Sequence, residues 1–369
     1  MGTLMRQPRL RYAVIGAGAG ILNAHRPALA LPEVDLAAVA DVNASVGRQR
    51  AEELGCAFYG DYRQMLAETG PDVVVIFTPP FLHASMAIDS LRAGSHVLIE
   101  KPMAVQVSEA DAMLDAARQN QRLLGVFFQH RFRPEVNAAR QLLQQQVLGQ
   151  IQRVELIATW PRPDSYFKLA SWRATWWGEG GGILTNQASH NLDVLCYLLG
   201  QPTRVVAWTR RLLHAIETED TVQAMLEWSD GALGMLHIST AEADRPERLK
   251  IVGTHGSLEL GPGELTAQIL DVDMRDYQVH CSDPYESPRA RPYEVTWEES
   301  TGDHVAVYRD FHQALLNGTD LRSDGIHGLE ELELANAINY SSYNHREVLF
   351  PLDQLDYATL LESLRQQNN

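Results

Sequence analysis

Two segments of the sequence carry residues that could take the proton of an alcohol and stabilise the negative charge that develops on its oxygen. Lys101 follows a short apolar run and precedes Pro102, so we expect its side chain at the carboxyl end of a strand, where ligands bind in open α/β folds. Asn186, His190 and Asp193 are spaced four and three residues apart, which predicts that one face of a helix presents all three. A histidine can accept the hydroxyl proton, while a lysine can stabilise the developing alkoxide. The structural alternatives are a solvated lysine and a core histidine satisfied by Asp193 and the backbone.

A glycine-rich turn follows the first apolar run of the chain. Gly16, Gly18 and Gly20 lie between that run and a segment rich in alanine and leucine, and Ile21 stands where a strict dinucleotide-binding fingerprint has its third glycine. Glycines at a strand-to-helix turn let backbone N–H groups and the helix N-terminus approach a pyrophosphate. The alternative is a turn with a purely structural role.

Asp41 ends the second apolar run, at the place where an acidic side chain can bind the hydroxyl groups of an adenosine ribose. Its carboxylate would repel a 2′-phosphate, and neither Val42 nor Asn43 supplies a cation to bind one. The sequence therefore predicts NAD, rather than NADP, as the cofactor. Capping of a helix over residues 43–54 is the alternative role for Asp41.

The elements that must position these residues differ between the two halves of the chain. In the first half, short apolar runs alternate with amphipathic stretches, as in a parallel sheet covered by helices. The predicted strands are 10–15, 34–40, 72–78, 96–99 and 123–128, and the predicted crossover helices include 45–54, 83–92 and 108–119. We expect a Rossmann domain over residues 1–128, with ligands bound at the carboxyl ends of its strands.

The second half, residues 129–369, reads as an α+β domain with a large, mostly antiparallel open sheet. The strands expected there are 151–160, 203–213, 221–228 and 232–240, and residues 283–292 are expected to form a surface excursion. Two helices, over 304–316 and 328–343, are expected to pack on one face of this sheet. We expect this domain to bind substrate in a cleft beside the nucleotide domain and to mediate self-association into a homodimer or homotetramer.

Composition limits the class of protein. Hydrophobic residues make up 45% of the 369 residues and charged residues 21%, which is ordinary for a globular protein. The formal net charge of −16 disfavours binding to nucleic acid or to an anionic membrane surface. Three widely spaced cysteines argue against a disulfide framework or a cysteine-rich zinc site, and no metal is expected. No signal peptide or membrane-spanning stretch is evident, which indicates a cytoplasmic location.

Two motifs resemble those of one enzyme family. Residues 96–102 read HVLIEKP and residues 180–193 read GGGILTNQASHNLD. These resemble the Glu-Lys-Pro motif and the glycine-rich motif of the Gfo/Idh/MocA oxidoreductases, the group of glucose-fructose oxidoreductase and inositol dehydrogenase. The resemblance covers almost the whole chain and includes Thr78, Pro79 and Pro80, with His83 shortly after them.

The family resemblance implies roles for individual residues. It places Lys101 beside the nicotinamide ring and His190 against the reacting hydroxyl, and it implies cofactor contacts from Thr78, Pro79, His83 and Glu100. Many members have an aspartate where this sequence has Asn186. With Gln187, that departure resembles a branch that includes sugar-nucleotide 3-dehydrogenases. We therefore assign substrate binding to Asn186 and Gln187, and the proton chemistry to Lys101 and His190, with Glu179 as the reserve base.

A further group of residues is a candidate for substrate contact. Trp172, Arg173, Trp176 and Trp177 precede the glycines, and sugars stack on such aromatic rings. A guanidinium at 173 could bind hydroxyls or a phosphate, and Arg131 is a weaker candidate of the same kind. A core role is the alternative for the tryptophans.

The sequence thus predicts an NAD-dependent dehydrogenase that transfers a hydride between nicotinamide and a secondary alcohol carbon. The substrate would be a sugar, inositol, glycoside or sugar nucleotide. One alternative is a redox-neutral enzyme with retained NAD, such as a glycosidase or epimerase acting through a transient keto-sugar. A non-catalytic NAD-binding regulator is the remaining one.

Overall fold

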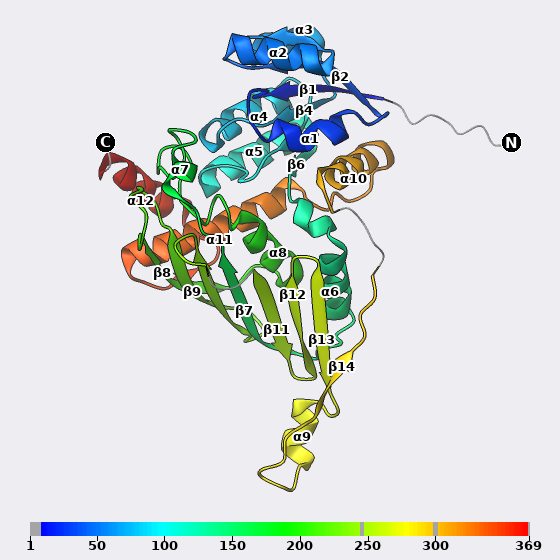
Figure 1. The fold of residues 1–369 in the computed structure, drawn as a ribbon, viewed down its shortest axis with the longest axis vertical. Helices are drawn as coiled ribbons and strands as arrows, with labels where there is room; N and C mark the ends of the chain where they lie inside the picture. Colours follow the sequence, from blue (N-terminus) through cyan, green and yellow to red (C-terminus); the bar gives the residue numbers. More distant parts are fainter. Residues whose placement is uncertain (1–8, 244–246, 298–301, 368–369) are drawn as a thin grey trace, which may run out of the picture. The chain divides into compact units, whose positions relative to one another are not determined.

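The computed structural model describes residues 9–243, 247–297 and 302–367, which divide into two compact units (Figure 1). The first unit comprises the described residues up to Gln129 together with Asp303–Leu329. The second comprises His130–Gly302 and the described residues from Glu330 onward.

The first unit contains, within the described residues, a six-stranded parallel sheet in the order β3-β2-β1-β4-β5-β6. The chain order reverses between β1 and β4, which is the switch point at which Rossmann folds bind dinucleotides. Its strands are β1 (Leu10–Ile15), β2 (Val34–Ala40), β3 (Ala57–Tyr59), β4 (Val73–Ile76), β5 (His96–Ile99) and β6 (Leu124–Val126). Its helices are α1 (Leu22–Leu29), α2 (Ala44–Leu54), α3 (Tyr62–Thr69), η1 (Pro80–Leu82), α4 (His83–Arg92), α5 (Val107–Asn120) and α10 (His304–Asn317).

The central strands of this sheet are apolar because both of their faces are covered. All four residues of β4 are buried, as are the last four of β1, and the sequence pattern identified both strands for that reason. The fold class predicted from sequence, a Rossmann domain plus a second domain with a large sheet, is confirmed. Strand β3 and helix α3 were not predicted; β3 is only three residues long and none of them is buried.

Helix α10 was expected on the sheet of the second half, and that expectation is wrong. It belongs to the first unit and packs against α1. The segment that follows α10 also joins this unit, since Ser323 accepts a hydrogen bond from the N–H of Val126 and Asp324 forms an antiparallel bridge to Gly125. An amphipathic pattern shows that a helix has an apolar face, but it does not say which sheet that face covers.

The second unit is built on a nine-stranded sheet, counted over the described residues, in the order β14-β13-β12-β11-β7-β10-β9-β8-β15. Neighbours are antiparallel except β7 and β10, which run parallel. Its strands are β7 (Ile151–Thr159), β8 (Arg204–Arg210), β9 (Thr221–Glu227), β10 (Leu233–Ser239), β11 (Arg248–Gly253), β12 (Gly256–Gly261), β13 (Glu264–Leu270), β14 (Ala290–Tyr293) and β15 (Val348–Leu349). The helices are η2 (Gln129–Phe132), α6 (Pro134–Gln144), α7 (Asp164–Phe167), α8 (Ser189–Leu199), α9 (Met274–His280), α11 (Gly325–Asn344) and α12 (Gln354–Gln367), of which η2 and α11 begin in the first unit.

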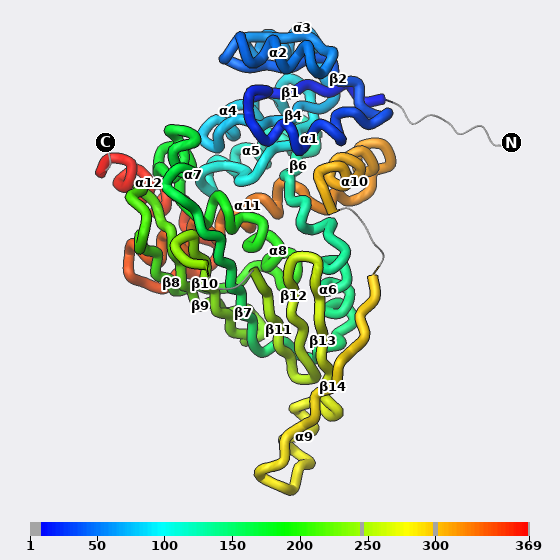
Figure 2. The backbone as a smooth tube through the Cα atoms, viewed as in Figure 1, coloured from blue at the N-terminus to red at the C-terminus, as the bar shows by residue number. Residues whose placement is uncertain are grey.

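Alternating burial shows that one face of this sheet is packed and the other is open. In β9 and β10 every second residue is buried, while Met225 and Met235 lie on the opposite face and remain 48% and 42% exposed. Helix α6 contacts β12 and β13 on the packed face. Beyond β13, α9 projects from the sheet, and the chain then returns as the edge strand β14 (Figure 2). No helix among the described residues is both long and apolar enough to cross a bilayer.

Candidate active site

The glycine-rich turn after β1 packs closely against the end of β4. Gly16 has a φ of 88°, and a Cβ at this position would lie 2.9 Å from the backbone nitrogen of Thr78. Only glycine accommodates both the left-handed backbone and this close approach. Gly18 and Gly20 are exposed, so the turn at the switch point leaves its backbone accessible to a ligand. Helix α1 begins one residue after the exposed Ile21.

Asp41 bridges this turn to the end of β2. Its Oδ2 accepts the N–H of Gly18 at 2.6 Å, and its Oδ1 accepts the N–H of Asn43 at 2.8 Å. Asn43, and not Asp41, is the N-cap of α2, accepting the N–H of Val46. The capping alternative for Asp41 is therefore wrong. A half-buried carboxylate beside an open glycine turn fits an adenosine ribose, with its hydroxyls as donors.

His83 ties together the loops that follow β4 and β5. Its Nε2 lies 2.7 Å from the carbonyl oxygen of Thr78, and its Nδ1 lies 2.9 Å from that of Pro102. The histidine is buried, whereas Thr78, Pro79 and Lys101 are half-buried at the carboxyl ends of the strands. His83 thus holds the two loops that carry the other predicted cofactor contacts.

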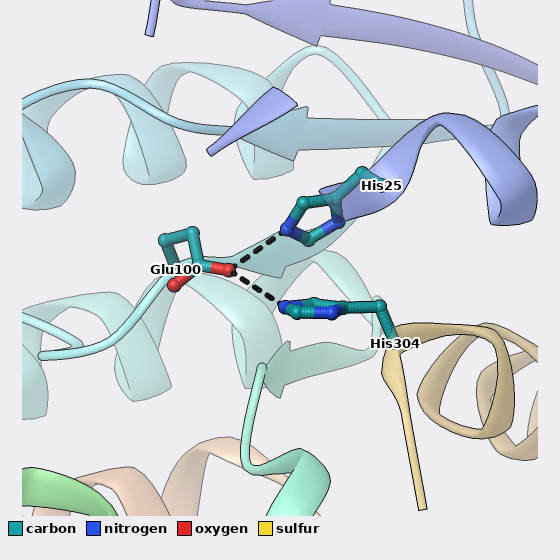
Figure 3. Close-up of side chains that lie close together, drawn as sticks. All are labelled: His25, Glu100 and His304. Atoms are coloured by element: carbon teal, nitrogen blue, oxygen red, sulfur yellow. Dashed lines mark hydrogen bonds and ion pairs between the residues drawn. The ribbon is translucent and has the colours of Figure 1, made fainter. Parts of the chain in front are cut away.

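Glu100, next to Lys101, is held in a buried cluster with two histidines (Figure 3). Its Oε1 lies 2.9 Å from Nε2 of His25 on α1 and 3.8 Å from Nε2 of His304 at the start of α10. Its Oε2 accepts the backbone N–H of Lys101 at 3.2 Å. The cluster therefore connects two helices of the first unit to the residue proposed to act on substrate.

The pKa values of this cluster reflect burial and mutual charge. Burial acts to raise the pKa of Glu100, but the hydrogen bond from His25 and the positive charges nearby outweigh it, so that the pKa is lowered. Burial and the neighbouring His25 lower the pKa of His304 to about 4. Glu100 is consequently a carboxylate at neutral pH, and His304 is a neutral imidazole.

Two histidines and a glutamate are also ligands that zinc accepts, and their ligand atoms lie within 4.8 Å of one another. Around a tetrahedral zinc, with bonds of about 2.0–2.1 Å, ligand atoms stand roughly 3.3 Å or more apart. The 2.9 Å between His25 and Glu100 is shorter than this separation and is instead the length of a hydrogen bond. We assign this cluster to hydrogen bonding.

In the second unit, the predicted substrate residues lie around the start of α8. The helix begins at Ser189, so His190 and Asp193 lie on it, whereas Asn186 lies in the preceding turn, where its N–H donates to the carbonyl of Gly182. The expectation that one helical face presents all three is therefore wrong for Asn186. Asn186, Gln187 and His190 are half-buried.

Two consecutive residues of η2 hold this helix. His130 stacks on His190 with ring centroids 4.2 Å apart and an interplanar angle of 24°. Arg131 and Asp193 are both fully buried, and the guanidinium donates from Nε to both carboxylate oxygens, at 2.9 and 3.0 Å. Arg131, a candidate for substrate contact, thus pairs its charge with that of Asp193.

Gly182, in the turn before Asn186, is required by the protein's own backbone. A Cβ on Gly182 would lie 2.1 Å from the carbonyl oxygen of Glu219. Oε1 of Glu219 accepts the N–H groups of Gly182 and Leu184 at 2.8 and 3.2 Å. Burial raises the pKa of Glu219 to about 7 against the effect of these bonds, and the charge of Glu179 adds to the rise.

Asn186 is connected to Arg173 through a residue that the sequence analysis missed. Arg173 donates from Nη1 to the hydroxyl of Tyr166 on α7 at 2.7 Å, and this hydroxyl donates to Oδ1 of Asn186 at 3.1 Å. The Nδ2 of Asn186 donates to Oε1 of Glu179, which is only 3% exposed. Trp172 is half-buried with the Arg173 guanidinium 5.1 Å from its ring centroid.

The other two tryptophans of this loop separate into different environments. Trp176 is fully buried, and its indole N–H donates to the carbonyl of Glu217 at 3.1 Å, which makes it a core residue. Trp177 remains 55% exposed.

Some of the missed residues carried a recognisable signal. His25 stands on the apolar stripe of α1 with Leu22 and Leu29, where a polar residue requires a buried partner. His130 and Tyr166 had no such signal, because their partners are 60 and 20 residues away in the sequence.

The parallel sheet, the open glycine turn at its switch point and the carboxylate at the end of β2 define a dinucleotide-binding protein of the Rossmann class. Matches to two family models define the class of protein more narrowly. Residues 10–128 match the family model described as "Oxidoreductase family, NAD-binding Rossmann fold", and residues 136–259 match the model of the GFO/IDH/MocA C-terminal domain. The chain belongs to the GFO/IDH/MocA family of NAD-binding oxidoreductases.

Named relatives support this assignment. The chain is 31% identical over 232 residues to D-glucoside 3-dehydrogenase of Escherichia coli, covering 62% of this chain and 64% of the relative. It is 28% identical over 266 residues to scyllo-inositol 2-dehydrogenase (NAD(+)) of Bacillus subtilis, covering 69% and 74%. Among solved structures, the WlbA dehydrogenase of Bordetella pertussis, in complex with NADH and UDP-GlcNAcA, superposes with a TM-score of 0.80 at 28% identity, covering 94% of this chain and all of that one.

Proposed function

We propose that this enzyme oxidises a secondary alcohol of a sugar-like substrate, with the hydride passing to NAD⁺ and the hydroxyl proton to a protein base. The product is the corresponding ketone. The observation that carries the proposal is the pairing, in one chain, of an NAD-binding sheet with a turn and helix that present Asn186, Tyr166 and His190 as half-buried polar side chains. Hydroxyl groups and amides of this kind bind polyols.

His190 is the proposed base. Its ring is half-buried and stacked on His130, and Asp193, three residues further along α8, is fixed by Arg131. A rigid support keeps an imidazole in the orientation that proton transfer needs. Lys101, on the loop after β5, is proposed to donate a hydrogen bond to the oxygen as negative charge develops there.

The cofactor is held by the chain's own residues in the first unit. We propose that the turn at Gly16–Gly20 and the N-terminus of α1 bind the pyrophosphate, and that Asp41 binds the adenosine ribose. NAD supplies the hydride acceptor when it is bound. The named activities of the relatives, on glucosides and inositol, support a cyclic polyol as the substrate class.

The test is a screen of NAD⁺ reduction with inositols, hexoses, glycosides and UDP-sugars, read by NADH absorbance. Stoichiometric NADH with at least one class is the expected result. Substrate conversion without NADH release would instead identify the redox-neutral alternative with retained NAD. Neither conversion nor reduction with any class would contradict the proposal and favour a regulatory NAD-binding role.

A further inference from the structure

Asn186 and three neighbouring side chains form a closed ring of interactions, which we call the Asn186 cluster: Arg173, Tyr166, Asn186 and Glu179. Arg173 donates to Tyr166, Tyr166 donates to Asn186, and Asn186 donates to Glu179. The ring closes because Nη1 of Arg173 lies 3.9 Å from Oε1 of Glu179. The guanidinium also lies over the Tyr166 ring, 4.6 Å from its centroid.

The direction of these hydrogen bonds is set by the two ends of the chain. A guanidinium can only donate, and an ionised carboxylate can only accept. The Tyr166 hydroxyl accepts from Arg173 and donates its single hydrogen onward to Oδ1 of Asn186. The atom that faces Glu179 must be a donor, and an amide side chain supplies one of each.

A carboxylate at position 186 would not fit this arrangement. Both of its oxygens are acceptors, so one of them would face Oε1 of Glu179, a residue that is only 3% exposed and already accepts the N–H of Ala174 through Oε2. Two carboxylates at that distance cannot both ionise without a large cost. The asparagine at 186 is thus matched to the glutamate at 179.

We propose that Glu179 is a positioning residue that fixes the Asn186 amide in one orientation and makes the cluster neutral, so that it recognises uncharged hydroxyl groups of the substrate. The ion pair balances the Arg173 charge within the protein, which removes the guanidinium as a binding site for a phosphate or carboxylate. This inference rests on the proposed function, because it identifies the part of the substrate that this turn binds.

The test exchanges the carboxylate at position 179 with the amide at position 186. In Glu179→Gln, the new amide points a donor at either the Ala174 N–H, which already donates, or Asn186, whose amide must then turn over to accept it. In Asn186→Asp, two carboxylates oppose each other. In the double variant, the new amide at position 179 donates to the new carboxylate at position 186 and accepts from Ala174. That carboxylate also accepts from Tyr166, so these three hydrogen bonds are restored, while the negative charge moves from position 179 to position 186.

We expect each single variant to raise KM for a polyol about 10-fold or more, with a smaller effect on kcat, because each leaves a buried polar group opposed. The double variant is expected to return KM to within about threefold of the wild type, since contacting residues are not additive. The KM of Asn186→Asp alone is expected to decrease towards that of the wild type as pH falls, because the two carboxylates can then share a proton. Gln141→Glu on α6 is exposed and makes the same exchange of amide for carboxylate, so it serves as the control with unchanged KM.

Additive KM effects in the double variant, or a KM of Asn186→Asp that does not change with pH, would overturn the inference. Failure of the proposed function has a different signature, since the wild type itself would then turn over no polyol. In that case the same four proteins are compared by thermal unfolding. If the melting temperature of the double variant falls by less than the sum of the two single-variant shifts, the result supports the hydrogen-bond chain. Additive shifts would refute it.

Discussion

The Arg131 guanidinium and the Asp193 carboxylate form an ion pair in which neither side chain has any exposed surface. It joins η2 to α8, and His130, next to Arg131, stacks on His190, three residues before Asp193. A buried pair of this kind adds little net stability over an apolar pair, but the loss of one partner leaves the other charged in the interior.

The first prediction follows from this asymmetry. Asp193→Ala should lower the free energy of unfolding of the second unit by about 3–5 kcal/mol, because it leaves the Arg131 charge without its buried partner. The double variant Arg131→Met with Asp193→Leu should recover most of the loss. Urea denaturation followed by circular dichroism measures both. A loss below about 1 kcal/mol in Asp193→Ala would mean that water reaches the guanidinium.

The second prediction concerns cofactor choice. NAD should bind more tightly than NADP, and Asp41→Ala should narrow the difference by removing both the ribose hydrogen bonds and the repulsion of a 2′-phosphate. Fluorescence titration of both cofactors provides the measurement. Asn43→Ala is the matched control, since it removes the N-cap of α2 at a cost of about 1 kcal/mol in stability and should leave cofactor preference unchanged. Equal affinity of the wild type for both cofactors would refute the role of Asp41.

The third prediction assigns the proton chemistry. Lys101→Ala and His190→Ala should each lower kcat by about 100-fold or more, while NAD affinity changes little. Steady-state kinetics and NAD titration separate the two effects. If His190→Ala kept near-full turnover with the pH profile of the wild type, the base would have to be another group, first Lys101 and then Glu179.

The fourth prediction uses the pKa of Glu219, which is about 7 in the folded protein against 4.5 for the free side chain. The folded state binds its proton more tightly, so this group's contribution to stability is complete below about pH 4.5 and is lost as pH rises through 7. Glu219→Gln keeps an oxygen that can accept from Gly182 and Leu184 and does not titrate. The melting temperature of Glu219→Gln, relative to that of the wild type, should therefore rise as pH increases from about 5 to about 8. Parallel pH profiles for the two proteins would contradict the shift.

The fifth prediction is self-association through the open face of the second sheet. Met225 and Met235 are cross-strand neighbours on that face, and Trp208 on β8 is 51% exposed. An apolar surface on a sheet of this size favours a homodimer or homotetramer. Light scattering should therefore return a multiple of 41.2 kDa, and Trp208→Glu with Met225→Glu should reduce the mass. A single 41.2 kDa species at micromolar concentration would contradict this prediction.

Sequence periodicity predicted the first unit well because its strands are buried on both faces. The bounds of β1, β2 and β5 agree with the expected runs to the residue. Strand β13 was not predicted, although its exposed and buried residues alternate as those of β9 and β10 do. Alternation of this kind is the pattern of a strand with one open face.

The site residues could be predicted only where a motif or a local spacing indicated them. Lys101, Asp41 and His190 lie in such places. The partners of Asn186 could not be predicted in the same way. The choice of asparagine over aspartate depends on Glu179 and Tyr166, which only the folded chain brings into contact with it. Pairing between distant side chains is a property of tertiary structure.

The return of residues 303–329 to the first unit has a consequence for how the protein is made. Ser323 and Asp324 cover the outer edge of β6, and the Tyr308 ring lies 5.4 Å from that of Phe127. During synthesis the ribosome delivers this segment only after the entire second sheet except β15, so the nucleotide-binding unit emerges first and yet is completed late. Until then its β6 edge and the aromatic residues beside it stay uncovered, so a nascent chain stalled before residue 303 exposes an edge strand that can pair with another chain.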